Sequence, residues 1–129
     1  MVYVLDTHAV VWFLEGSSRL GAAAKAAMSD PAVDLVVPTI VLVEAGFLYA
    51  KKRTSIDVTA VQQTLIAAAN CVAYPLDEQV VALIPNSLNI HDAIIVATAL
   101  VYKDILNLPV EVVTKDAEIT ASGLVKTCW

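Results

Sequence analysis

The sequence has few cysteines, few charged residues and no long apolar run, and each absence excludes a class of protein. Cys71 and Cys128 are far apart and form no CxxC pair, so we expect neither a disulfide framework nor a zinc site. No window reaches about 18 uninterrupted apolar residues, which excludes a predicted membrane span. No basic segment precedes the apolar run after Met1, so we expect no signal peptide. Together these features predict a cytoplasmic protein without membrane contact.

Apolar residues are abundant instead. They make up 58% of the 129 residues, and charged residues make up 16%. A typical globular domain is roughly 45–50% apolar, so this chain has little polar surface to cover a monomer. We therefore expect a homo-oligomer, most simply a homodimer, or a bound protein partner. The length suits one domain over residues 1–129, and no repeat or linker divides it.

The net charge of −5 argues against broad electrostatic binding of nucleic acid. A metal-dependent nuclease is an exception. Its carboxylates count as negative charge in the sequence, but the divalent cations that they bind present positive charge to the substrate. The basic cluster Lys51-Lys52-Arg53 is best explained as the C-terminal end of a helix.

Apolar patterning predicts strands that alternate with helices. The expected strands are 2–5, 33–37, 71–74 and 110–114, with a fifth near 124–127; the expected helices are 7–15, 22–29, 39–52, 58–69, 77–83 and 90–102. Such an order predicts a three-layer α/β/α sandwich with a central parallel sheet of four or five strands. Ligands in such folds bind beyond the carboxyl ends of the strands.

Two aspartates follow predicted strands at that edge. Asp6 comes directly after the first strand, and Asp116 follows the fourth in Val113-Thr114-Lys115-Asp116. Each residue also has an ordinary structural explanation. Asp6 could cap the next helix, and Asp116 could serve a turn.

Glu44 lies on a predicted helix among apolar neighbours at i±3 and i±4, such as Val41 and Phe47. That face is expected to be core, and no basic residue of the same helix segment could pair with the carboxylate. An unpaired buried carboxylate would cost several kcal/mol. We therefore expect a metal ion or a bound proton to satisfy Glu44.

Asp92 lies in the first turn of its helix, three residues after the predicted N-cap Asn89. An acid there favours the helix dipole and completes a capping box, so a structural role explains it as well as a functional one does. Its helical face is nevertheless apolar, with Ile95 and Val96 after it.

Several carboxylates at one sheet edge could not all stay ionised without cations. Oxygen ligands suit Mg²⁺ or Mn²⁺, and such ions activate water for phosphodiester hydrolysis. We therefore hypothesise a metal-dependent nuclease with Asp6, Glu44, Asp92 and Asp116 as its site. A receiver-like phosphoacceptor would need an aspartate where the chain has Tyr74-Pro75, and an aspartyl phosphatase would need an acid at His8. An inert binding scaffold stays open as the alternative.

Four segments, in order, resemble the PIN domain, in particular the VapC-like toxins of type II toxin–antitoxin systems. They are Leu5-Asp6-Thr7-His8, the run from Pro38 to Glu44, the run from His91 to Leu100, and Val113-Thr114-Lys115-Asp116. The resemblance implies a Mg²⁺- or Mn²⁺-dependent endoribonuclease that acts on RNA, is usually dimeric and is often inhibited by a small antitoxin protein. By motif, Asp6, Glu44, Asp92 and Asp116 become the acidic tetrad and metal ligands, with the hydroxyls of Thr7 and Thr114 beside them.

Three further side chains neighbour these acids. His8 and His91 could act as acid/base groups, although histidines in such positions more often serve in packing. Trp12, on the first predicted helix, is expected in the core or an interface.

Overall fold

A parallel sheet of five strands runs through the centre of the computed structural model, which describes residues 1–129. The strand order is β3-β2-β1-β4-β5, and β1 pairs with both β2 and β4, so that Val4 lies between Val36 and Val112. The bounds are β1 Val2–Leu5, β2 Asp34–Pro38, β3 Cys71–Tyr74, β4 Val110–Val113 and β5 Lys126–Cys128. The predicted parallel sheet is confirmed, with five strands.

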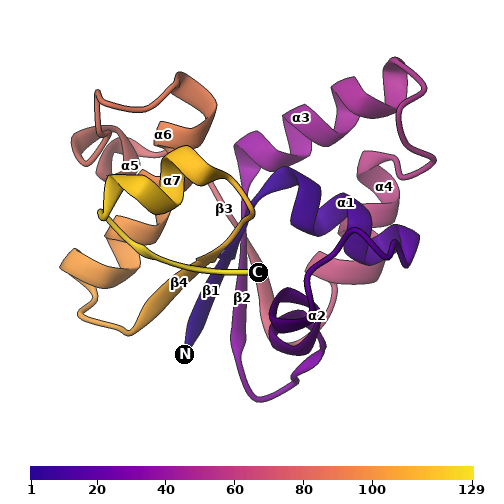
Figure 1. Cartoon of the computed structure of the whole chain (residues 1–129), viewed down its shortest axis with the longest axis horizontal. Helices are drawn as coiled ribbons and strands as arrows, with labels where there is room; N and C mark the ends of the chain where they lie inside the picture. The colour runs from indigo at the N-terminus through magenta and orange to yellow at the C-terminus, as the bar shows by residue number, and fades with distance from the viewer.

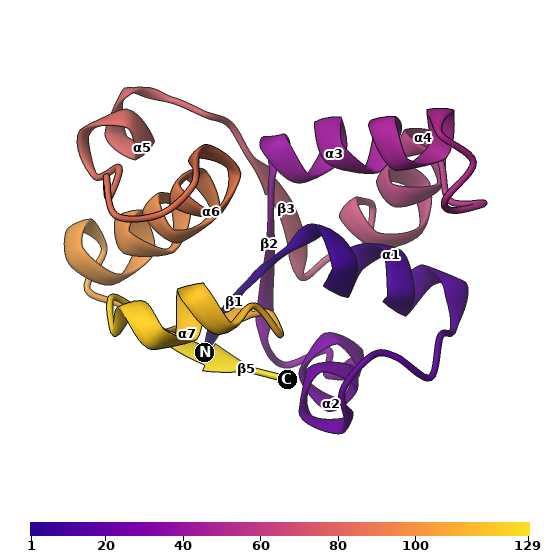
Figure 2. The same ribbon diagram turned by 45° about the horizontal axis from the view of Figure 1, so that its top comes forward.

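Helices cover both faces of the sheet. In Figures 1 and 2, α1 to α4 lie on one side, and α5, α6 and α7 lie on the other. Their bounds are α1 Thr7–Glu15, α2 Ala22–Ser29, α3 Thr39–Ala50, α4 Val58–Ala60, α5 Glu78–Ala82, α6 Ile90–Leu100 and α7 Ala117–Ser122; π-helical segments η1 Val61–Ile66 and η2 Val101–Ile105 continue α4 and α6. This is the predicted three-layer α/β/α sandwich. None of its helices has both the length and the apolarity needed to cross a membrane.

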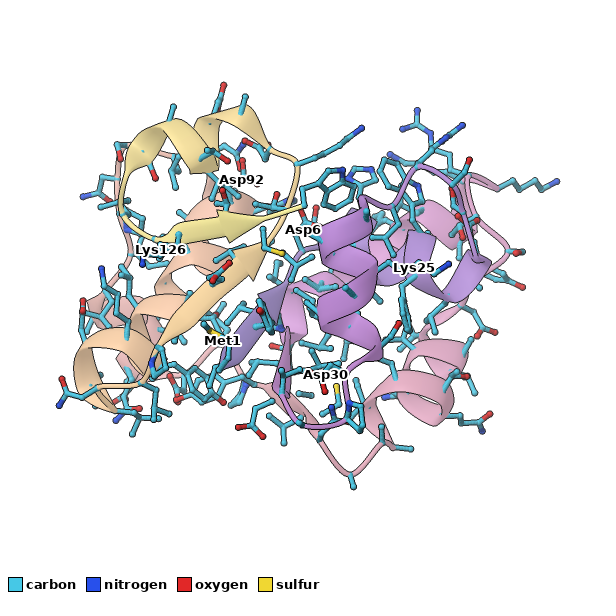
Figure 3. The ribbon with its side chains drawn as sticks, turned by 60° about the horizontal axis from the view of Figure 1, so that its bottom comes forward. Met1, Asp6, Lys25, Asp30, Asp92 and Lys126 are labelled. Atoms are coloured by element: carbon cyan, nitrogen blue, oxygen red, sulfur yellow. The ribbon has the colours of Figure 1, made fainter.

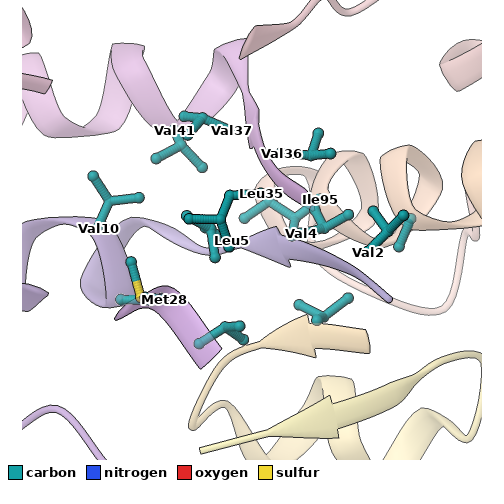
Figure 4. Packing of buried hydrophobic residues seen from close by; sticks show 14 of the residues in the cluster. Val2, Val4, Leu5, Val10, Met28, Leu35, Val36, Val37, Val41 and Ile95 are labelled. Carbon is teal, nitrogen blue, oxygen red and sulfur yellow. The ribbon is translucent and has the colours of Figure 1, made fainter. Parts of the chain in front are cut away.

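The core fills both sides of the central strands. Val4 and Leu5 of β1 are completely buried, as are Val36 and Val37 of β2. Figure 4 shows Leu5 beside Leu35, with the helical side chains of Val10 from α1, Met28 from α2 and Val41 from α3 around it. A strand that is covered on both faces needs a continuous apolar run, which is the pattern that marked these segments in the sequence.

Several predicted boundaries were wrong by a few residues. The helix expected over 58–69 ends at Ile66, because the chain turns before β3, where the Asn70 side-chain amide donates a hydrogen bond to the Val33 carbonyl at 2.8 Å. The helix expected over 90–102 continues to Ile105 through η2. The strand expected over 33–37 and the one expected near 124–127 are Asp34–Pro38 and Lys126–Cys128.

The strand order changes direction beside β1. From β1 the chain moves outward through β2 to β3, then returns across the sheet to place β4 on the other side of β1. In doubly wound sheets a ligand site forms at the carboxyl ends of the strands where the order reverses. Asp6 follows β1 and Asp116 follows β4 at this point. Figure 3 shows Asp6 and Asp92 in the upper half of the view, above Met1 and Asp30.

Candidate functional site

A cleft of about 700 Å³ opens at the carboxyl edge of β1 and β4. All four acids predicted from the sequence line it, namely Asp6, Glu44, Asp92 and Asp116. They come from four separate segments of the chain, so the fold gathers residues that are far apart in sequence.

Asp6 forms the floor of the cleft and is only 8% exposed. It is also the N-cap of α1, because one carboxylate oxygen accepts a hydrogen bond from the Ala9 amide at 2.8 Å. Burial raises the pKa of Asp6, while the Thr114 hydroxyl and the Ala9 amide act in the opposite direction. The charge of Asp116 raises it further. Asp6 therefore caps α1, as its structural explanation predicted, and it also lines the cleft.

Asp116 is the N-cap of α7. Its Oδ1 accepts hydrogen bonds from the amides of Glu118 at 2.8 Å and Ile119 at 3.1 Å. Its own amide donates to the hydroxyl of Thr114, which is buried at the end of β4. With Oδ1 occupied by the cap, Oδ2 carries no hydrogen bond from the protein. The Thr114 hydroxyl thus connects the backbone of Asp116 to the end of β4 and lies near the Asp6 carboxylate.

Asp92 and Asn89 form a reciprocal pair at the start of α6. The Asn89 side-chain oxygen accepts from the Asp92 amide at 3.0 Å, and the Asn89 side-chain amide donates to Asp92 Oδ2 at 2.7 Å. Partial burial raises the pKa of Asp92, and the nearby charges of Asp116, Glu44 and Glu118 add to that increase. Repulsion between these carboxylates therefore disfavours the ionised form of Asp92.

Glu118 was missed by the sequence reasoning. Oxygen atoms of Asp92, Asp116 and Glu118 all lie within 4.8 Å of one another, and Asp6 and Glu44 are not part of this compact group. Glu118 comes two residues after Asp116, in the first turn of α7. The available signal was a second acid two residues after Asp116, in the segment Asp116-Ala117-Glu118.

The geometry of this three-acid group suits a hard divalent cation. Mg²⁺ binds oxygen at about 2.0–2.1 Å, so two of its ligands are at most about 4.2 Å apart. Asp92, Asp116 and Glu118 approach that spacing before any adjustment of the exposed Glu118 side chain. Carboxylates so close together are stabilised by a cation that neutralises them.

The surroundings of Glu44 differ from the prediction. The face that it shares is not all core, because Phe47 is 63% exposed, and the Glu44 side chain itself is 27% exposed. The carboxylate also has two protein partners. The Thr7 hydroxyl donates to Oε1 at 2.9 Å, and His91 Nδ1 lies 3.2 Å from Oε2. The inference that the protein offers Glu44 no partner was therefore wrong, because Thr7 and His91 come from other helices.

The two histidines occupy different surroundings. His91 is exposed in the cleft beside Glu44, whereas His8 packs its ring against Trp12 with a centroid separation of 5.0 Å. Trp12 is buried, as predicted, and Lys115 lies over its ring at 4.6 Å. The cleft therefore combines carboxylates at its centre with cationic and aromatic groups at one rim.

Two comparisons with known proteins agree with this fold. A family model described as the PIN domain matches residues 3–121. A chain in the crystal structure of VapBC2 from Rickettsia felis, bound to a DNA fragment from its promoter, superposes with a TM-score of 0.63. That alignment covers 98% of this chain and 97% of the other at 11% sequence identity, so it bears on the fold alone. No match was found among curated proteins.

Proposed function

The chain belongs to the PIN domain family, and from that premise we propose that it is a divalent-metal-dependent endoribonuclease that hydrolyses RNA phosphodiester bonds. One observation carries the proposal: Asp92 and Asp116 line the cleft at the switch point of the sheet, and oxygens of these two carboxylates and of Glu118 lie within 4.8 Å of one another. Proteins of this family generally act as nucleases. Mg²⁺ and Mn²⁺ are the ions that such an oxygen-only set favours.

Each acid has a distinct task in this proposal. Asp92 and Asp116 would hold the ion, and Glu118 would complete its contacts from α7. Asp6 lies beneath them and adds negative charge from the floor of the cleft. When bound, a divalent ion lowers the pKa of a coordinated water and stabilises charge on the phosphate oxygens.

The helix caps give these carboxylates fixed positions. Asp116 is tied through Oδ1 to the start of α7, and Asp92 is tied through Oδ2 to Asn89. The remaining oxygen of each carboxylate accepts no protein hydrogen bond and is available to an ion. Preorganised ligands of this kind reduce the cost of ordering the site on binding.

Cleavage assays test the proposal. Wild type and Asp92→Asn would be incubated with a panel of mixed-sequence RNAs in Mg²⁺, in Mn²⁺ and in EDTA. The proposal predicts cleavage by wild type that depends on metal, and loss of that cleavage in the variant. Equal cleavage by both proteins would refute the assignment. Binding of RNA or protein by wild type, with no cleavage under any condition, would favour the inert scaffold.

We further propose that the chain is a homodimeric, cytoplasmic toxin of a toxin–antitoxin pair, inhibited by a small antitoxin protein. The high apolar content supports a protein interface, as do the exposed side chains of Val43 and Phe47 on α3. The neighbour that shares the fold comes from a VapBC2 complex. Expression with the product of a short upstream reading frame should relieve growth arrest, and sedimentation should give the mass of a dimer.

A further inference from the structure

Two basic side chains lie over the same aromatic ring at the rim of the cleft. The ammonium nitrogen of Lys115 is 4.6 Å from the centroid of the Trp12 ring, and the guanidinium carbon of Arg19 is 5.7 Å from it. Both distances are within the range of about 6 Å in which a cation is attracted to the face of a tryptophan. Trp12 therefore gathers two positive charges in a protein whose net charge is −5.

The ring that holds these cations is itself fixed by packing. Trp12 is buried, and its ring contacts the rings of His8 and Trp129 at centroid separations of 5.0 Å and 5.8 Å. Trp129 in turn packs so closely against Gly21 that a Cβ at that position would have no room. A ring held on several sides keeps one orientation, so it favours one location for each cation that lies over it.

Lys115 connects this ring to the acids of the cleft. It lines the cleft and directly precedes Asp116 in the chain. The residue is exposed, and no carboxylate of the protein forms an ion pair with its ammonium group. Arg19, in the turn after α1, is likewise exposed and forms no ion pair. Both cations are therefore accessible to an anion that approaches from solvent.

A nucleic acid strand needs such cations at the rim. When one of its phosphates reaches the acid cluster, the neighbouring phosphates must pass the rim of a cleft whose centre is negative. Lysine and arginine bind phosphate oxygens, and this contact fixes the strand in place without reading its bases. The positive charges over Trp12 offset the repulsion that the acids exert on the flanking phosphates.

From this arrangement, and resting on the proposed function, we propose that Lys115 and Arg19 bind backbone phosphates of the RNA strand beside the one at the acid cluster. Trp12 is their positioning residue. The strand then leaves the cleft over α1, toward the turn that follows this helix. Because all sequences share the phosphate backbone, these contacts add affinity without selecting a cleavage sequence.

The salt dependence of RNA binding tests this role. Binding of a short fluorescent single-stranded RNA would be measured at several KCl concentrations, with Ca²⁺ in place of Mg²⁺. Each phosphate contact contributes about 0.7 to the slope of log K against log [KCl] for single strands. Lys115→Gln and Arg19→Gln should each reduce the slope by about that amount, and the double variant should reduce it twice as much. Lys115→Arg keeps the charge and should keep the wild-type slope.

The matched control is Lys25→Gln, which removes the same charge from an exposed position on α2. Lys25 does not line the cleft, and Figure 3 shows it apart from Asp92. This variant should keep the wild-type slope. An equal decrease in Lys25→Gln would overturn the proposal, because it would show a general effect of net charge. An unchanged slope in Lys115→Gln would overturn it as well.

Proton NMR tests the positioning role of Trp12. In wild type, the ring current should shift the ε-methylene protons of Lys115 upfield, because the ammonium group lies over the ring. Trp12→Leu should remove that shift and weaken RNA binding roughly twofold to fivefold, the effect of one exposed cation–π contact. Unshifted ε-methylene protons in wild type would contradict the role of Trp12, and that measurement needs no variant to fold.

The outcomes for this inference and for the proposed function are distinguishable. Wild type that shows the expected slopes but cleaves no RNA would support the phosphate contacts and refute the proposed function. Cleavage by wild type, with an unchanged slope in both single variants, would refute this inference alone. Failure of wild type to bind RNA at any salt concentration would contradict both.

Discussion

The two sides of the cleft treat their carboxylates differently. On one side, Glu44 is satisfied by Thr7 and His91, which come from α1 and α6. On the other, Asp92, Asp116 and Glu118 crowd together with no cationic partner among them, above the buried Asp6. The first side is complete within the protein. The carboxylates of the second side repel one another unless a cation binds between them. A divalent ion and substitutions of these acids should therefore affect the two sides differently.

The largest expected effect is on catalysis. Asp116→Asn should lower metal-dependent RNA cleavage by roughly 10²–10⁴-fold, because it removes a charged oxygen from the proposed ion site. Asparagine is as good an N-cap as aspartate, so α7 should persist. The matched control is Asp57→Asn, since Asp57 caps α4 in the same way, through the Ala60 amide, and lies outside the cleft. Comparable losses of cleavage in both variants would contradict the assignment.

The next largest effect is on the rise in melting temperature with Mn²⁺, which should differ between variants on the two sides of the cleft. Saturating Mn²⁺ should raise the melting temperature of wild type by several degrees, because an ion that binds only the folded state stabilises it by about 2.7 kcal/mol at 100 times its Kd. Asp92→Asn should lose most of this increase, and Glu44→Gln should keep it. Differential scanning fluorimetry with and without EDTA would measure the difference. Equal losses in the two variants would place Glu44 among the ion ligands.

The melting temperature without metal should show that the buried charge of Asp6 destabilises the folded protein. Burial raises the pKa of Asp6, so the metal-free folded state is favoured while Asp6 is protonated. This contribution to the free energy of unfolding is present below the pKa that Asp6 has in the unfolded chain. It is lost as the pH rises through the raised pKa of Asp6 in the folded state. Asp6→Asn should therefore melt roughly 2–5 °C higher than wild type at pH 7 in EDTA.

The advantage of Asp6→Asn should shrink as the pH falls toward the acid range, where the wild-type carboxyl becomes neutral. Melting curves at a series of pH values would follow it. An advantage that stayed constant at every pH would show that the charge of Asp6 is not the cause.

The smallest expected effect concerns the satisfied side. Thr7→Val removes one hydrogen bond to Glu44 and should lower the free energy of unfolding by about 0.5–1.5 kcal/mol in urea. Thr98→Val is a suitable control, because its buried hydroxyl donates to the Ile94 carbonyl within its own helix at 2.8 Å. Such a bond contributes little to helix stability. Equal losses in both variants would remove the special role of the Thr7–Glu44 contact.

Local patterns were enough to predict most of the fold. Strands such as Val2–Leu5 are continuous apolar runs because both faces are buried, and the Asn89 cap marks the start of α6. The same patterns failed where nonlocal contacts decide. The side-chain amide of Asn70 donates a hydrogen bond to the Val33 carbonyl in the turn before β3. The local sequence around Asn70 or around Val33 does not predict that contact.

The candidate site was predictable in part for the same reason. Asp6 and Asp116 follow strands, so the topology alone brings them to one sheet edge. Glu44 was interpreted only from its own helix, whereas its partners Thr7 and His91 lie on other helices. The approach of Glu118 to Asp92 depends on how α7 packs near α6, which no spacing in the sequence records.

The central claim is that the crowded carboxylates form an ion site and Glu44 does not. Diffraction from crystals soaked in Mn²⁺, with anomalous differences collected near the manganese edge, tests it most directly. The account predicts a peak at coordination distance from oxygens of Asp92 and Asp116, with Glu44 still contacting His91. A peak coordinated by Glu44, or no peak in the cleft at millimolar Mn²⁺, would contradict it.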